Sequence, residues 1–279
     1  MFRGQSMSKE LIFHVGLGKT GSSYLQQAFF PKLHGVKYIQ TRRFHKFEKD
    51  LDRAPDGKFF LSREFDQQLE RESVRISNYD KDAKIIVVFR PQAPWIGSQY
   101  KRFTKNGMHE TFDEFFDIDN DQGLWKQDEL YWMKKIEIIE KYFTQKPLVL
   151  FQEDLKEEPY KFFDDIANYM GARYNKDEIS LESIHKARTD KQLKMMRKFG
   201  TIFFKKNQVL SENYFINRFQ SRIRQFKTLT VIFSSVFFPG SYFDDIELLP
   251  KEQLKKIAEH YADDYAEVRA YARENNPTY

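Results

Sequence analysis

The amino-acid sequence predicts an α/β fold, a doubly wound parallel sheet flanked by helices and followed by a helical C-terminal extension. Three observations predict this class. Short, continuous apolar segments recur in the earlier part of the chain, as in strands buried on both faces. Amphipathic helical stretches lie between those segments. Beyond about Lys191 the strand pattern stops, and long, aromatic-rich helical stretches follow.

The buried-strand pattern occurs in four segments, which are residues 11–15 (LIFHV), 59–61 (FFL), 84–89 (KIIVVF) and 147–151 (PLVLF). Ligands of doubly wound sheets bind where the carboxyl ends of the strands meet. We therefore expect the functional residues directly after these segments.

Helices are expected at residues 22–30, from Glu64, from Asp128, and finally from Pro250 to about Glu274. In the third of these stretches, Leu130, Met133 and Ile136 fall at helix spacing. No Gly-, Pro- or Ser-rich linker precedes the helical extension. We therefore expect a single domain over residues 1–279, with a core at about 9–190 and an extension at about 191–279.

Composition excludes several classes of function. The chain has no cysteine, which rules out disulfides, thiolate metal sites and cysteine nucleophiles. Its net charge of +5 suits an anionic ligand but is modest for nucleic-acid binding, so no nucleic-acid partner is expected. The polar N-terminal stretch lacks the apolar segment of a secretory signal, and the longest apolar run, from Val231, is too short to span a bilayer. A cytoplasmic protein is expected.

The segment IFHVGLGKTGSSY has the outline of a strand, a phosphate-binding loop and a helix start. The nucleoside-triphosphate loop G-x-x-x-x-G-K-[ST] would require glycine at position 13, where this chain has Phe13. The loop is P-loop-like, but it lacks the arch that wraps a diphosphate. Amides, hydroxyls and an ammonium remain to hold a single phosphate, from Lys19, Thr20, Gly21, Ser22 and Ser23. The alternative is an ordinary strand-to-helix turn with a solvent-facing lysine.

A second segment, KIIVVFRPQAPWIGSQYKRF, places Arg90 at the end of a buried strand and Ser98 on the predicted helix that follows. An arginine just past a strand end can donate two parallel hydrogen bonds to a second phosphate, with the Ser98 hydroxyl as a further donor.

Taken together, these segments resemble the sulfotransferases that use 3′-phosphoadenosine 5′-phosphosulfate (PAPS), most closely the bacterial members. HVGLGKTGSSYLQ is similar to the family's 5′-phosphosulfate loop, and FR followed by Ser98 is similar to its 3′-phosphate segment. A third similarity is PLVLFQEDLKEEPYKFFDDIANYMGA, which resembles the family's strand, E-D-L turn and helix. The resemblance spans roughly residues 11–172.

The resemblance implies that PAPS is the co-substrate and that no metal is needed. It places Lys19 beside the bridging oxygen of the phosphosulfate and Arg90 with Ser98 at the 3′-phosphate. Many relatives have tryptophan where this chain has Tyr24, so adenine stacking at that position is unassigned. A later basic segment of the family corresponds to LESIHKARTDKQL, in which Lys186 or Arg188 would help to hold the 3′-phosphate.

The acceptor hydroxyl needs a general base, and two residues are candidates. Glu64 follows a buried strand and should lie at the ligand edge of the sheet; alternatively it begins a helix that Ser62 caps. His14 adjoins the loop and can titrate near neutrality, but its place within an apolar strand fits a buried structural histidine equally well.

Two other stretches have competing interpretations. DIDNDQGLWKQD, from Asp117, is similar to a calcium loop but has its glycine one position late, and a solvated acidic loop accounts for it better. The aromatic and basic stretch from Phe199 to Phe238 fits a helical core with snorkelling basic side chains, or a surface that meets a membrane or an acceptor. The E-D-L turn at Glu153 is expected to order its loop rather than to catalyse.

The sequence therefore predicts a sulfotransferase that moves a sulfuryl group from PAPS to a hydroxyl, or less readily an amine, of an unidentified acceptor such as a carbohydrate or a lipid-linked glycan. Peripheral membrane contact is compatible with it, and the oligomeric state is open. Two alternatives remain. One is a P-loop kinase or NTPase, and the other is a catalytically silent sulfotransferase-like binding protein.

Overall fold

The computed structural model describes residues 9–182, 188–204 and 214–277, without the side chains of residues 214–219. The chain forms two compact units. The first comprises Met1–Pro91, Tyr131–Ile184 and Ala262–Tyr279, and the second comprises Gln92–Leu130 and His185–Tyr261. The assignment of both to a single domain stays a prediction.

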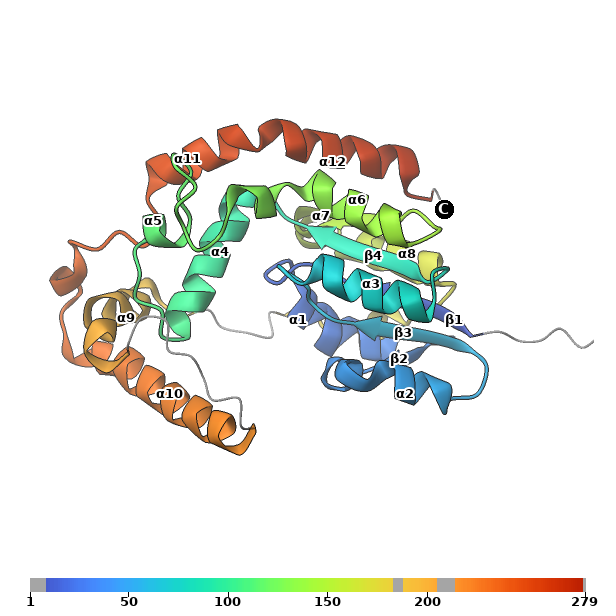
Figure 1. Cartoon of the computed structure of the whole chain (residues 1–279), viewed down its shortest axis with the longest axis horizontal. Coiled ribbons are helices and arrows are strands. Elements are labelled where there is room, and N and C mark those ends of the chain that lie inside the picture. The colour runs from blue at the N-terminus through green and yellow to red at the C-terminus, as the bar shows by residue number, and fades with distance from the viewer. Residues whose placement is uncertain (1–8, 183–187, 205–213, 278–279) are drawn as a thin grey trace, which may run out of the picture. The chain divides into compact units, whose positions relative to one another are not determined.

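The first unit contains a five-stranded, fully parallel sheet with the order β2-β3-β1-β4-β5 (Figure 1). The strands are β1 (Glu10–His14), β2 (Lys37–Ile39), β3 (Lys58–Ser62), β4 (Lys84–Phe89) and β5 (Leu148–Phe151). The α/β class and the four predicted strands are confirmed. Strand β2 was not predicted, because this three-residue edge strand is only half-buried to exposed and lacks a continuous apolar run.

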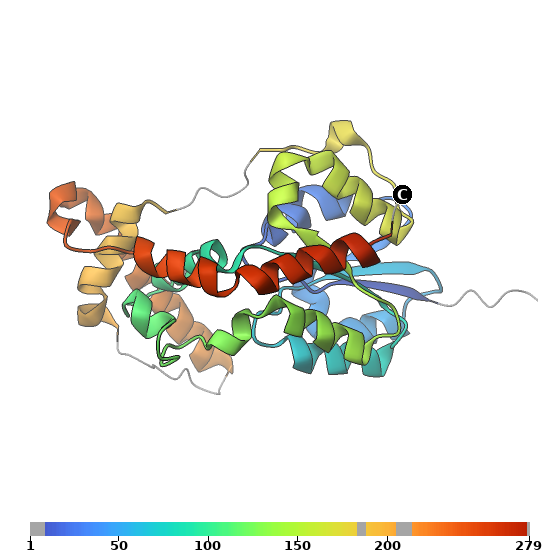
Figure 2. The same cartoon turned by 90° about the horizontal axis from the view of Figure 1, so that it is seen from above.

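Helices cover both faces of the sheet. Figure 2 shows helix α8 (Pro159–Met170) on one side and helices α3 (Leu69–Tyr79) and α6 (Trp132–Tyr142) on the other. On the α8 side, Ile12 and Ile86 belong to one buried cluster with Ile166. On the other side, Phe89 stacks on Trp132 with ring centroids 5.7 Å apart. Alternate strand residues thus supply two separate cores.

The strand order creates one switch point in the sheet. Strand β1 pairs with both β3 and β4, and the chain passes from β1 to the β2 edge but from β4 to the β5 edge. A crevice at the carboxyl ends of β1 and β4 is where doubly wound sheets bind ligands. The predicted phosphate loop and Arg90 directly follow these two strands.

Helix α3 begins at Leu69, so the prediction of a helix from Glu64 is corrected. Residues 63–65 run beside the loop without regular secondary structure instead, because the amides of Arg63 and Phe65 donate to the carbonyls of His14 and Gly16 at 2.9 and 3.2 Å. Ser62, the proposed helix cap, is the last residue of β3.

The final helix is also corrected, since it divides at Tyr261 into α11 (Lys251–His260) and α12 (Ala262–Asn275). Helix α12 belongs to the first unit and joins its elements through polar side chains. The Asp264 carboxylate accepts from the amides of Trp132 and Met133 at 2.9 and 3.1 Å, which caps α6. Beyond α12, the Asn276 side chain pairs with both backbone groups of Val149 on the edge strand β5.

The described part of the second unit is helical, and it includes α4 (Gln92–Lys105), α5 (Phe112–Phe115), α9 (Asp190–Phe203), α10 (Tyr214–Ser234) and α11. The 3-10 turns η6 (Ser235–Phe237) and η7 (Gly240–Phe243) follow α10. Met196, Ile232 and Phe243 form the centre of a buried cluster. In the acidic loop, the Asp117 carboxylate accepts from the amides of Asp119 and Asn120 at 3.0 Å, and these backbone hydrogen bonds lower the pKa of Asp117.

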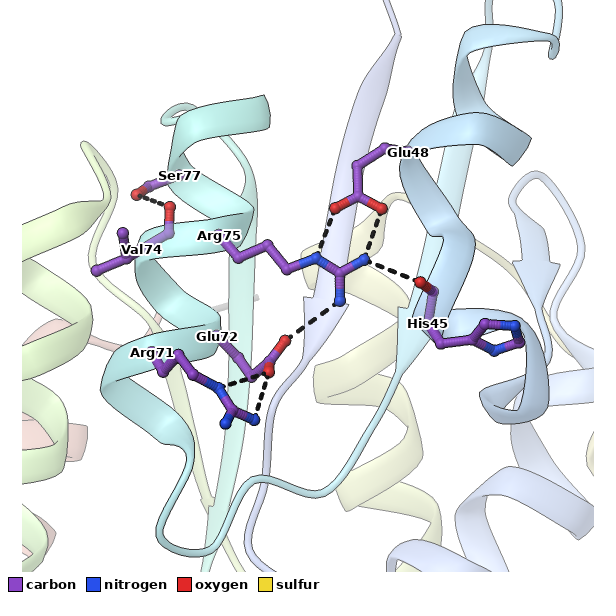
Figure 3. A network of polar contacts seen from close by, with 7 residues as sticks. All are labelled: His45, Glu48, Arg71, Glu72, Val74, Arg75 and Ser77. Atoms are coloured by element: carbon purple, nitrogen blue, oxygen red, sulfur yellow. Dashed lines mark hydrogen bonds and ion pairs between the residues drawn. The ribbon is translucent and has the colours of Figure 1, made fainter. Parts of the chain in front are cut away.

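A polar network joins α3 to α2 (Phe47–Asp52) on the outer side of the first unit (Figure 3). Arg75 of α3 donates two hydrogen bonds to the Glu48 carboxylate, both at 2.6 Å, and another to the His45 carbonyl at 3.2 Å. Its guanidinium also lies over the Phe47 ring, 4.8 Å from the centroid. The network thus ties α3 to α2, whose Phe47 packs against Phe13 with ring centroids 5.4 Å apart.

We expect Arg75→Lys to lower the free energy of unfolding by about 1 kcal/mol, because lysine cannot form the paired hydrogen bonds to Glu48. Urea unfolding measures this change. Arg71→Lys is the matched control, since Arg71 is 75% exposed and pairs with the adjacent Glu72. Equal losses in the two variants would contradict the role given to Arg75.

Candidate functional site

The loop after β1 has the backbone of an anion-binding turn. Lys19 and Gly21 have left-handed φ angles of 69° and 97°, and the helical run begins directly afterwards at Ser22. Left-handed residues in a tight turn direct successive amides to one side, as in anion-binding nests. The first amides of a helix also have no intrahelical acceptor. The backbone of residues 19–23 is therefore suited to surround one phosphate.

Two of the predicted hydroxyls hold the loop rather than face its outer side. The Thr20 hydroxyl donates to the Leu17 carbonyl at 2.6 Å, and the Ser22 hydroxyl donates to the same oxygen at 3.2 Å. Both side chains are buried, whereas Lys19 and Ser23 are exposed. The arrangement leaves the Lys19 ammonium and the Ser23 hydroxyl at the surface of the loop, together with its amides.

The predicted helix at residues 22–30 is present but irregular. It consists of α1 (Ser22–Tyr24), a π-helical segment (Leu25–Phe29) and a 3-10 turn (Phe30–Lys32). π-Helical segments occur often near functional sites. Tyr24 lies on this run, half-buried, with its ring stacked 6.3 Å from Phe163 and its hydroxyl donating to the Ser180 carbonyl at 2.7 Å. Burial raises the pKa of Tyr24.

Glu64 lies in the extended segment after β3, between the two residues whose amides bond to the loop backbone. Its side chain is half-buried. Two residues further on, the Asp66 carboxylate accepts from the Gly18 amide at 2.8 Å. The segment thus follows the loop closely and places the Glu64 carboxyl group at the same edge of the sheet.

His14 is buried beneath the loop. Its Nδ1 shares a 2.8 Å hydrogen bond with the Ser62 hydroxyl, which also accepts from Gln26 at 3.0 Å. A Cβ atom on Gly16 would lie 2.7 Å from His14 Nε2, so the ring occupies the space that the absent side chain leaves. Burial lowers the pKa of His14 to about 4. A neutral imidazole packed beneath the loop fits a positioning role.

Arg90 follows β4 and reaches the loop. Its guanidinium donates to the Lys19 carbonyl at 3.4 Å, while its own carbonyl accepts from the Trp132 indole at 2.8 Å. Burial lowers the pKa of Arg90, and the negative charge of Glu153 opposes that shift. A guanidinium partly removed from water binds an anion more strongly than an exposed one.

The E-D-L segment lies within the short helix α7 (Gln152–Glu157), and the C-terminal helix α12 holds it. Both carboxylate oxygens of Glu153 accept from the Tyr265 hydroxyl, at 3.0 and 2.8 Å, and Asp154 pairs with Arg269 at 3.0 Å. Burial, followed by the hydrogen bond to Glu153, raises the pKa of Tyr265. The interactions keep the Glu153 charge near Arg90.

The predicted residues fall into three groups. The first unit brings together the loop residues Lys19 to Ser23 with His14, Glu64 and Arg90 at one edge of the sheet. Ser98, half-buried on α4, and Arg188 belong to the second unit, where the Arg188 guanidinium lies 5.0 Å from the centroid of Phe233. Lys186 lies outside the described residues.

The sequence did not reveal Asp66 or Tyr265 as parts of this site. Asp66 lies two residues after Glu64, and this closeness in the sequence was the only available signal. Tyr265 and Arg269 are four residues apart and share a helix face, but a sequence does not specify which distant carboxylates such a face meets.

No family model matches the chain, and no curated protein matches it in sequence. Among solved structures, a sulfotransferase from Alicyclobacillus acidocaldarius is similar with a TM-score of 0.46 and 11% identity, over 84% of this chain and 98% of that one. Mouse sulfotransferase SULT7A1 complexed with PAP is similar with a TM-score of 0.40 and 16% identity, over 73% of this chain and 68% of that one. Both are sulfotransferases by name. The α/β fold of this chain rests on its own strand order and parallel pairing.

We expect the stability of the protein to fall as the pH is lowered from about 7 to about 5, and His14 to account for about 2 kcal/mol of the fall. The unfolded chain takes up a proton near the ordinary pKa of 6.5, whereas the folded chain resists protonation down to about 4. Stability is therefore lost as the pH falls through this window. Urea unfolding at both pH values measures the loss.

His14→Gln should show a smaller loss over the same pH range, whatever its stability at neutral pH. His45→Gln is the control, because His45 is exposed and should leave the pH dependence of the wild type in place. A pH dependence unchanged by His14→Gln would disprove that the imidazole is buried in its neutral form.

Proposed function

We propose that the protein is a PAPS-dependent sulfotransferase, which transfers a sulfuryl group to a hydroxyl of an acceptor. The observation that carries this proposal is the contact between Arg90 and the Lys19 carbonyl at 3.4 Å, which sets a guanidinium directly beside the single-phosphate loop. A ligand with two separated phosphates, one of them bearing sulfate, suits a short loop with an adjacent arginine better than a triphosphate does.

In this proposal the loop amides and Lys19 hold the 5′-phosphosulfate, and Arg90 holds the 3′-phosphate. Ser98, Arg188 and Lys186 are further proposed contacts of the 3′-phosphate, and Tyr24 is a proposed neighbour of the adenine. The acceptor is proposed to be a carbohydrate or a lipid-linked glycan. A cytoplasmic location stays a prediction as well.

The proposed transfer exchanges one S–O bond for another. The acceptor oxygen bonds to sulfur, the bond from sulfur to the bridging oxygen breaks, and adenosine 3′,5′-bisphosphate (PAP) leaves. Lys19 stabilises the charge that develops on the bridging oxygen, and Glu64 takes the proton from the acceptor hydroxyl. By analogy with phosphoryl transfer, positioning and electrostatic stabilisation supply most of the rate enhancement. His14 supports the loop from beneath.

We expect PAP to raise the melting temperature in the absence of magnesium, because the proposed site holds two phosphates with amides and cationic side chains. Arg90→Ala should lose most of that shift. Arg53→Ala is the control, since Arg53 is exposed at the end of α2. Thermal-shift measurements with PAP and with magnesium-ATP distinguish a sulfotransferase from a kinase or NTPase. Stabilisation by magnesium-ATP alone would favour a kinase or NTPase.

We expect Lys19→Ala to lower the rate of sulfuryl transfer from PAPS by about 10²-fold to 10³-fold, because a donor to the developing charge is lost. Glu64→Gln should lower it by about 10²-fold to 10⁴-fold while leaving PAP binding intact, because only the proton acceptor is lost. Labelled PAPS with fractionated cell extract provides the assay. A wild-type protein that binds PAP but transfers nothing to any fraction would favour the catalytically silent alternative.

A further inference from the structure

Helix α10 of the second unit has apolar side chains on two opposite faces. One face is buried, because Thr228, Val231 and Ile232 are at most 6% exposed, with Val231 and Ile232 packed in a cluster with residues of α9. On the other face, Phe226 is 72% exposed and Phe233 is 52% exposed. At about 100° per residue, the two sets lie on opposite sides of the helix.

The exposed side chains form a single stripe. Its members are Ile223, Phe226, Thr230, Phe233 and, in the turn η6, Phe237, which is 83% exposed. Their spacing of three and four residues keeps them on one side of the helix. Single exposed apolar residues are common on proteins, but several of them, including three phenylalanines, in a row on one side of a helix indicate an interaction surface.

Basic side chains flank this exposed stripe. Arg222 and Lys227 are exposed, and helix geometry places them on opposite borders of the stripe. The Arg188 guanidinium lies over the ring of Phe233, 5.0 Å from its centroid. Residues 214–243 contain Arg218, Arg222, Arg224 and Lys227 but no aspartate or glutamate. Acidic residues nearly balance basic ones over the whole chain, at 41 against 46, so the local excess of positive charge is specific to this segment.

We propose that the exposed stripe binds the surface of a membrane that contains anionic lipids. Phenylalanine side chains would enter the boundary between headgroups and acyl chains, while Arg222 and Lys227 remain at the level of the negative headgroups. In the described residues no helix is long and apolar enough to cross a bilayer, and the proposed contact lies on the membrane surface. The proposal does not depend on the transfer reaction.

A second copy of the chain is a less suitable occupant of the stripe. Two such helices packed through their stripes would bring their Arg222 and Lys227 borders together, with no acidic residue in the segment to pair with them. Like charges beside a helix interface oppose association. An anionic lipid surface supplies the missing negative charge.

Sedimentation of the full-length protein with lipid vesicles tests the proposal. We expect binding to vesicles of phosphatidylcholine mixed with phosphatidylserine, much weaker binding to phosphatidylcholine alone, and a decline with added salt. The double variant Arg222→Glu/Lys227→Glu should weaken binding at least about tenfold. The double variant Phe233→Ser/Phe237→Ser should do the same through loss of apolar contact.

Two controls alter similar side chains elsewhere. Leu124→Ser changes a residue that is 58% exposed, and Lys255→Glu changes one that is 70% exposed; both should bind vesicles like the wild type. Circular dichroism verifies that every variant is folded. The proposal is overturned if the wild type does not bind the mixed vesicles, if the phenylalanine variant binds them unchanged, or if the stripe instead forms a dimer that the same variant dissociates.

Discussion

The pairing of β1 with β4 is the constraint on which the rest of the candidate site depends. The ladder continues past the end of β1, because the Val15 amide donates to the Ile86 carbonyl at 2.9 Å. On the opposite side, the Phe65 amide donates to Gly16. The base of the loop is therefore hydrogen-bonded on one side to β4 and on the other to the segment that follows β3. The same pairing of β1 with β4 places Arg90, which follows β4, beside the loop.

The sequence was most informative where burial determines structure. Continuous apolar runs identified β1, β3, β4 and β5, since a parallel strand covered on both faces has no polar side to show. Strand β2 could not be found in this way, because it is stabilised by backbone pairing with β3 and not by burial of its own side chains. The start of α3 was missed for a similar reason. The amides of Arg63 and Phe65 donate to the carbonyls of His14 and Gly16, and local helix propensity does not include such distant partners.

The candidate site shows a comparable division. Residue types and spacing identified the segments that meet at the sheet edge, but not the direction of each side chain. Thr20 and Ser22 are of residue types that often bind phosphate. Their hydroxyls nevertheless donate to the Leu17 carbonyl and hold the turn. Similarly, the Glu153 carboxylate in the E-D-L segment is held by the Tyr265 hydroxyl, more than a hundred residues away in the sequence. Contacts of this range depend on the fold as a whole.

Helix α10 shows why hydrophobicity alone could not separate the two interpretations of the aromatic and basic stretch. Its sequence is apolar on two sides. A buried helical core and an exposed binding surface would both be predicted from the same phenylalanines. The structure separates them, since Val231 and Ile232 form the core while Phe226 and Phe233 do not. Arg224 belongs with the core side, because its guanidinium lies 6.0 Å from the centroid of Phe204. Arg222 and Lys227 instead border the exposed face, which is the face that we propose to bind a membrane surface.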